Sequence, residues 1–167
     1  MNSEFCSPQV KEIRIRPADA GDAPAIARVL YASFKEYKSL YTDSAFAVTT
    51  PPARKIAERL EEGAIWVAQQ NNTIVGTVSA INKDDGLYIH GMAVSPLWRG
   101  QKVGWRLLEQ VETLARKAGA ERLYLSTTPF LSRAIQLYKA YGFTESDEGP
   151  HEVLGTPLFT MVKNLKP

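Results

Sequence analysis

The sequence predicts a mixed α+β fold, an α/β/α arrangement in which helices cover both faces of a mostly antiparallel sheet of about six or seven strands. Two observations lead to this prediction. In the first half, three apolar runs follow one another and only turn-forming residues separate them, which is typical of an antiparallel meander. In the second half the pattern becomes strand, helix, strand, helix, and such helices must cross the sheet.

The N-terminal third is expected to hold one strand and two helices. Residues 13–16 alternate apolar and charged side chains up to Pro17, which suits a half-buried strand. Asp22 offers an N-cap to a first helix, whose apolar positions are Ile26, Val29, Leu30, Phe34 and Tyr37. Residues 50–52 (Thr-Pro-Pro) precede a second helix, which Gly63 is placed to end and whose apolar positions are Ala53, Ile56, Ala57 and Leu60.

The meander is expected over residues 64–69, 73–81 and 86–94. Asn71-Asn72 separates the first two runs, and Asp84-Asp85-Gly86 separates the second from the third. Both are turn sequences, because Asn, Asp and Gly accept the backbone angles that tight turns need.

The elements predicted after the meander are a helix over residues 103–118, a strand over 122–127 and a helix over 132–141. Gly119 and Gly142 stand where C-terminal caps belong. A last apolar stretch, residues 156–162, is expected to add an edge strand or an inserted strand.

Length and composition limit the class of protein. The 167 residues, 44% of them hydrophobic, predict one domain over residues 11–167 after a flexible leader, residues 1–10. A formal charge of only +2 argues against a dedicated nucleic-acid binder. With no signal peptide and no run of about 18 apolar residues, we expect a cytoplasmic protein without a membrane partner. Cys6, the one cysteine, can supply neither an internal disulfide nor a metal cluster, and no metal is expected.

The junction between the third strand of the meander and the next helix carries the strongest functional signal. It reads "MAVSPLWRGQKVGWRLLEQ" from Met92 to Gln110. A helix begins with backbone N–H groups that lack intrahelical partners, and Gly100 and Gly104 would let a ligand approach them. Arg99 and Lys102 add positive charge, so the turn suits a phosphate or pyrophosphate. A plain turn with solvated basic residues is the alternative, and neither GxGxxG nor GxxxxGK[ST] occurs.

Together with its neighbours, this junction resembles the GNAT superfamily of N-acetyltransferases. The family's acetyl-coenzyme A signature is Q/R-x-x-G-x-G/A, and residues 99–104 (RGQKVG) occupy it after Ala93-Val94-Ser95-Pro96. "AIQLYKAYGF", residues 134–143, matches the family's tyrosine-bearing helix that ends in Gly-Phe. The order of elements agrees from about Ile13 to Leu165. The resemblance therefore implies the GNAT fold and acetyl-coenzyme A as cofactor.

Two positions depart from the family pattern. Lys102 replaces the first glycine of the signature, which is acceptable if its φ stays negative. Leu131 occupies the position of an asparagine that often touches the pantetheine arm, so that contact is expected to be either lost or replaced by Thr127 or Ser132. The cofactor-binding residues implied by the resemblance are Met92, Ala93, Val94, Arg99, Gly100, Gln101, Lys102, Val103, Gly104 and Ser132.

Acyl transfer to an amine needs a proton acceptor for the amine and a proton donor for the leaving thiolate. By resemblance Tyr138 faces the coenzyme sulfur as general acid, and the alternative is a core aromatic in an ordinary apolar stripe. His90 is the candidate base, since imidazole is mostly neutral at pH 7; a water relay, or a histidine merely hydrogen-bonded on the sheet, remains open. Tyr88 shares the face of His90, and His151 and Glu152 are weaker candidates. The resemblance also implies a main-chain N–H near Met92 as oxyanion donor.

The acceptor site in this family usually comes from the first two helices and the C-terminal loops. That region supplies the substrate-binding candidates Phe34, Tyr37, Tyr41 and Phe46, to which Tyr88 is added. Glu36 and Asp43 could pair with a cationic amine. The expected partner is a small amine, an antibiotic or a protein or peptide amine, and packing of the first helix is the alternative role for the aromatic residues. A homodimer is an open alternative to a monomer.

The leading hypothesis is an acetyl-coenzyme A-dependent N-acetyltransferase that transfers the acetyl group directly. A covalent thiol intermediate is not expected, because Cys6 lies far in sequence from the motifs. The alternatives are a non-catalytic GNAT-like module that binds an acyl-coenzyme A as a sensor, and an interaction domain that binds neither.

Overall fold

The computed structural model describes residues 12–166, so the predicted leader and Cys6 lie outside the described residues. The helices are α1 (Ala23–Phe34), α2 (Asp43–Thr49), α3 (Ala53–Glu62), α4 (Val103–Lys117) and α5 (Ser132–Tyr141). The strands are β1 (Ile13–Pro17), β2 (Ala64–Gln70), β3 (Thr73–Lys83), β4 (Gly86–Val94), β5 (Arg122–Thr127), β6 (Thr144–Ser146), β7 (Glu152–Val153), β8 (Thr156–Pro157) and β9 (Phe159–Asn164). Short 3₁₀ helices are η1 (Ala20–Asp22), η2 (Lys35–Leu40) and η3 (Pro96–Trp98).

Seven strands form one sheet in the order β1-β2-β3-β4-β5-β9-β6. Each neighbouring pair is antiparallel except β4 and β5, which run parallel. The predicted fold class and the meander are confirmed. The last apolar stretch contains an inserted strand, since β9 lies between β5 and β6, while β7 and β8 make a separate two-stranded ribbon.

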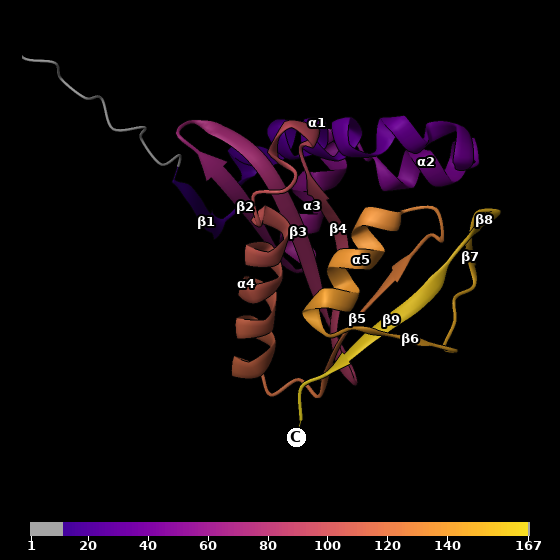
Figure 1. The fold of residues 1–167 in the computed structure, drawn as a ribbon. Helices are drawn as coiled ribbons and strands as arrows, with labels where there is room; N and C mark the ends of the chain where they lie inside the picture. The colour runs from indigo at the N-terminus through magenta and orange to yellow at the C-terminus, as the bar shows by residue number, and fades with distance from the viewer. Residues whose placement is uncertain (1–11, 167) are drawn as a thin grey trace, which may run out of the picture.

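The sheet buries an apolar cluster on each face. Neighbouring β2 residues point to opposite faces, so Trp66 packs with the α4 and α5 side and Val67 with the α1 and α3 side. Figure 1 shows α4 and α5 together on one side of the sheet. On α4 the residues with 0% exposure recur at helical spacing: Leu107, Leu108, Val111 and Ala115. Burying each leucine contributes about 2 kcal/mol, which fixes α4 on the sheet.

Strands β4 and β5 separate beyond a short paired stretch. Their pairing joins Leu87–Ile89 with Leu123–Leu125, after which the two strands diverge (Figure 1). On the other edge, Thr77 pairs with Ala93 and Ser79 with His90, so two β4 residues oppose one β3 residue. This is a β-bulge, and Gly91 within it has a φ of +61°, which favours glycine. The bulge and the divergence make the second half of β4 accessible between the two parts of the sheet.

One helix was missed, the predicted side-chain cap of α1 is wrong, and the predicted end of α3 at Gly63 is confirmed. The local sequence patterns did not predict α2, where the Thr42 hydroxyl accepts a hydrogen bond from the Ala45 N–H. Asp22 does not cap α1 with its side chain, because its carboxylate instead forms an ion pair with Arg16 at 2.7 Å. Gly63 ends α3 in an extended conformation, and a Cβ there would lie 2.6 Å from the Ala80 carbonyl oxygen.

Among residues 12–166, none of the helices combines the length and the apolar character that a membrane span requires. In the same range, no cluster of three or more His, Cys, Asp or Glu side chains is placed to hold a metal ion.

Candidate functional site

Two hollows meet at the accessible half of β4. The first, of about 720 Å³, runs between the end of β4, the start of α4 and the start of α5, and we call it the coenzyme groove. The second, of about 290 Å³, lies under α2 and α3 beside the middle of β4, and we call it the acceptor cavity. Four side chains line both hollows: Phe34, Met92, Leu131 and Tyr138. The two hollows are therefore adjacent.

Most of the predicted cofactor-binding residues line the coenzyme groove: Met92, Ala93, Val94, Arg99, Gly100, Lys102, Val103 and Gly104. Gln101 and Ser132 are not among its lining residues, and Leu131, Arg133 and Leu137 are. Thr127, the other suggested replacement for the missing asparagine, lines the acceptor cavity instead.

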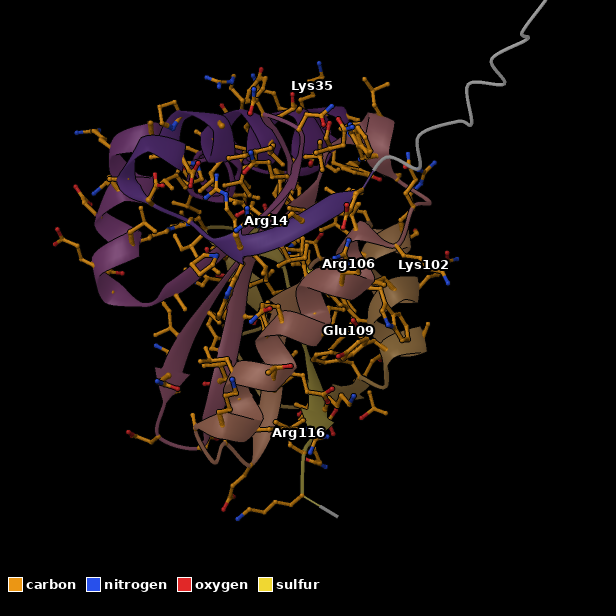
Figure 2. The ribbon with its side chains drawn as sticks, turned by 90° about the vertical axis from the view of Figure 1, so that its left-hand side faces the viewer. Arg14, Lys35, Lys102, Arg106, Glu109 and Arg116 are labelled. Atoms are coloured by element: carbon orange, nitrogen blue, oxygen red, sulfur yellow. The ribbon has the colours of Figure 1, made fainter. Side chains whose placement is uncertain are left out.

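The start of α4 presents backbone donors to the groove. Among the turn and loop hydrogen bonds of residues 12–166, none is donated by the backbone N–H groups of residues 102–104, and no side chain caps the helix. These amides lie at the start of a helix of 15 residues, whose N-terminal end is positive. Lys102 lies at the same end and its side chain points outward (Figure 2). The turn is thus a concentration of hydrogen-bond donors without an anion from the protein itself.

The expectation of a negative φ at Lys102 is wrong. Lys102 has a φ of +61° and a ψ of 19°, the left-handed conformation. A Cβ disfavours this conformation, which gives a physical reason why the signature usually has glycine at this position.

Replacing Lys102 by glycine is expected to raise the free energy of unfolding by about 1 kcal/mol, because the left-handed strain disappears and only part of the gain is offset by the freer unfolded chain. Urea denaturation measures this change. Gln101→Gly is the matched control; it has a negative φ and should lose stability. A Lys102→Gly protein less stable than the wild type would contradict the strain argument.

The two glycines of the turn serve different purposes. At Gly100 the φ is +79° and no atom lies within 4 Å of an added Cβ, so the backbone angle alone requires glycine. Gly104 is buried, and a Cβ there would lie 2.7 Å from Leu137 Cδ2. Its missing side chain therefore lets α5 approach α4 closely and brings Tyr138 toward the groove.

The side chain of Arg99 contacts both α1 and η2. Its Nη2 lies 2.5 Å from Glu36 Oε1 and donates a second hydrogen bond to the Ser33 carbonyl oxygen. The Ser33 hydroxyl in turn donates to the Val94 carbonyl oxygen at 2.8 Å. These contacts attach the N-terminal helices to the turn. They also engage Glu36 with an arginine, so the structure gives no support to its predicted pairing with a cationic amine.

Tyr138 is 7% exposed and lines both hollows where they meet. It packs against Phe143, with ring centroids 5.8 Å apart, so it is a core aromatic that also lines both hollows. Burial raises the pKa of its phenol above the ordinary value of 10. The hydroxyl therefore stays protonated throughout the physiological range and is available as a proton donor.

His90 and Tyr88 both line the acceptor cavity, as their shared strand face predicted. Their rings are stacked, with centroids 6.0 Å apart and an interplanar angle of 19°. Burial, followed by the positive charges of Arg59 and Lys83, lowers the pKa of His90 to about 4. The imidazole is therefore neutral at pH 7 and can accept a proton, although it is a weak base.

The lowered pKa of His90 makes stability depend on pH. The unfolded chain binds a proton near pH 6.5 and the folded chain only near 4, so folding stability from this group is fully present above pH 6.5 and decreases as the pH falls toward 4. We expect His90→Gln to reduce this decrease by roughly 3 kcal/mol. Chemical denaturation at several pH values measures it, with the exposed His151→Gln as control. Parallel profiles for wild type and His90→Gln would contradict the assignment.

The predicted substrate-binding aromatics divide between the two hollows. Phe34, Tyr41 and Tyr88 line the acceptor cavity, whereas Tyr37 lines only the coenzyme groove. Burial raises the pKa of Tyr41 to about 12. Phe46 packs against Tyr41 with ring centroids 6.0 Å apart and lies behind the cavity wall. The lining residues include none of Asp43, His151 and Glu152.

Sequence reasoning missed Arg59. The residue lies within the second predicted helix but was not singled out, yet its side chain lines the acceptor cavity beside His90. No local pattern distinguishes it from Arg54 on the same helix, which is exposed. Only the tertiary structure, which places Arg59 beside Gly91 of β4, makes the difference.

The residues present fit the predicted coenzyme. Backbone donors at residues 102–104 and the charge of Lys102 suit a diphosphate, and the walls formed by Val94, Leu131 and Leu137 suit an apolar arm. The separated edge of β4 offers unpaired backbone groups near Met92, where the sequence predicted an oxyanion donor.

Comparison with known proteins agrees with this arrangement. The model of the acetyltransferase (GNAT) family matches residues 28–143. An uncharacterized N-acetyltransferase, YjgM, of Escherichia coli K12 is 31% identical over 132 residues, which cover 75% of this chain and 78% of that protein. An IAA acetyltransferase of Azospirillum brasilense is 38% identical over 86 residues, which cover 50% and 55% of the two chains.

Among solved structures, the PaiA N-acetyltransferase of Thermoplasma acidophilum, crystallised in complex with coenzyme A, superposes with a TM-score of 0.79. It is 20% identical in sequence, and the match covers 92% of this chain and 99% of that one, which shows a shared fold. The family model spans more than half of the chain, so the predicted family and enzyme class are confirmed: this protein belongs to the acetyltransferase (GNAT) family.

Proposed function

We propose that this protein is an acetyl-coenzyme A-dependent N-acetyltransferase that transfers the acetyl group directly to a primary amine. The observation that carries the proposal is the meeting of the two hollows at Tyr138, because a direct transfer requires both reactants in one continuous space. When bound, acetyl-coenzyme A supplies the acetyl group as an activated thioester.

Residues at the start of α4 hold the coenzyme in this proposal. The backbone N–H groups of residues 102–104 donate to the diphosphate, and Lys102 adds a formal positive charge. Arg99 contributes indirectly, since its contacts with Glu36 and Ser33 fix the turn against α1 and η2. A backbone N–H of the free edge of β4 near Met92 polarises the carbonyl that is attacked.

Two titratable side chains accept and donate the protons of the reaction. The neutral imidazole of His90, or a water beside it, accepts a proton from the amine in the acceptor cavity. The phenol of Tyr138 holds the proton that the leaving thiolate needs. Phe34 and Leu131, which line both hollows, exclude water from the point of transfer.

Calorimetric titration with acetyl-coenzyme A, followed by a screen of amines that detects released thiol, tests the proposal. We expect saturable binding and acetylation of at least one class of amine. Binding without turnover of any amine would favour the non-catalytic sensor over the enzyme. The absence of both binding heat and a thermal shift would contradict both functions.

A further inference from the structure

Helix α3 brings one guanidinium group into the acceptor cavity. Arg59 is the arginine among the residues that line the cavity, next to Gly91 in the β4 bulge. A methyl group at Gly91 would lie 3.5 Å from Arg59 Nη1. The side chain donates one long hydrogen bond, 3.5 Å from its Nη2 to the Val48 carbonyl oxygen. Within residues 12–166, no carboxylate lies within ion-pairing distance of this guanidinium.

The walls of the acceptor cavity offer no negative charge to balance Arg59. Neither Asp nor Glu occurs among the described residues that line the cavity, and its polar side chains are hydroxyls, His90 and Arg59 itself. Burial lowers the pKa of Arg59, and the charge of Glu62, which neither lines the cavity nor forms an ion pair with Arg59, opposes this only in part. The charges of Arg59 and Lys83 contribute to the low pKa of His90. The cavity therefore has a positive potential, which is unfavourable for a simple cationic amine.

We propose that the acceptor is a small amine that also carries a carboxylate, an amino acid, and that Arg59 binds this carboxylate. The inference rests on the proposed acetyltransferase function and specifies its substrate class. A half-buried guanidinium with no carboxylate at ion-pairing distance is unfavourable, and a carboxylate matches its geometry with two parallel hydrogen bonds.

The size of the cavity agrees with this class of acceptor. Its volume of about 290 Å³ equals that of roughly ten liquid waters, so it suits a molecule of about ten heavy atoms. Burial of the substrate also fits the chemistry of the site. Desolvation in the cavity disfavours the ammonium form of the substrate, so the amine can lose its proton although His90 is a weak base.

Matched substrate pairs test the proposal. The common amino acids are screened as acceptors with acetyl-coenzyme A, and the best of them is compared with its neutral amide, which keeps the amine and side chain. We expect kcat/KM to be about 10- to 100-fold higher for the acid, mainly through a lower KM. Preference for the amide would overturn the role of Arg59 while leaving the acetyltransferase function intact. Preference for the aminophosphonate analogue over the acid would overturn the carboxylate assignment.

Variants on α3 separate substrate binding from a structural role. Arg59→Gln should remove most of the discrimination between acid and amide, and Arg59→Lys should restore part of it through charge alone. Arg54→Gln, an exposed position on the same helix, is the control and should discriminate like the wild type. Undiminished discrimination in Arg59→Gln would overturn the proposal.

Binding provides a second readout. In calorimetry with coenzyme A present, the acid should bind to the wild-type protein and about 10- to 100-fold more weakly to Arg59→Gln. Equal affinity for both proteins would overturn the proposal. If acetyl-coenzyme A itself fails to bind to the wild type, the proposed function fails first, and the two failures are thereby distinguished.

Discussion

Replacing Tyr138 by phenylalanine is expected to lower kcat by about 10²–10⁴-fold, the usual effect of removing a general acid. The substitution removes one hydroxyl at the junction of the coenzyme groove and the acceptor cavity and keeps the buried ring that packs on Phe143. The dissociation constant of coenzyme A should therefore change little. Thiol release under saturating substrate gives kcat, and calorimetry gives the dissociation constant.

Tyr141→Phe is the matched control for this result. Tyr141 lies one turn further along α5, and its hydroxyl donates to Glu112 on α4, outside both hollows. Its loss should reduce stability by about 1 kcal/mol and leave kcat unchanged. Wild-type turnover in Tyr138→Phe, or equal losses in both variants, would show that Tyr138 acts only as a core aromatic.

Replacing Gly104 by glutamate is expected to weaken coenzyme A binding by about 100-fold or more, since losing two hydrogen bonds to a charged group amounts to roughly 3–6 kcal/mol. The new side chain would meet Leu137 and Met92 at once, because even its Cβ would lie 2.7 Å and 3.3 Å from their side-chain carbons. Its charge would also stand beside the free amides at the start of α4. Calorimetric titration measures the affinity.

Because Gly104→Glu also disturbs packing, a second variant is needed that tests the effect of charge alone. Lys102→Glu reverses a charge at the same turn on an exposed side chain and should weaken binding by about tenfold. Lys117→Glu, at the opposite end of α4, makes the same change of charge and should leave affinity intact. Equal affinities for coenzyme A in all three variants and the wild type would locate its phosphates elsewhere.

Local sequence patterns were sufficient for most elements of the fold. The strand over residues 122–127 and the helix over 132–141 agree with β5 and α5, because their apolar periods match a strand and a helix and glycines mark the helix ends. α2 was not predicted. Its seven residues are too few to show a helical period, and its position depends on contacts with Thr156 and Leu154 more than 100 residues away.

The candidate site could likewise be predicted only in part. Residues 99–104 could be recognised because consecutive residues make the turn before α4, and the family resemblance supplied Tyr138 and His90. The environment of these residues was not predictable. The left-handed conformation of Lys102 results from the backbone geometry of the turn. The ion pair between Glu36 and Arg99 joins two different elements, and the low pKa of His90 depends on burial and on charges from other elements.

The sequence by itself determined the family, the enzyme class and the turn at the start of α4, since each depends on residues close together along the chain. Tertiary structure alone decided which side chains surround the acceptor cavity, because α2, α3, β4 and α5 bring them together from distant parts of the chain. The electrostatic potential in a cavity is the sum of the contributions of all the charged residues around it. A single arginine on α3 can therefore set the electrostatic character of the cavity without any local signal in the sequence.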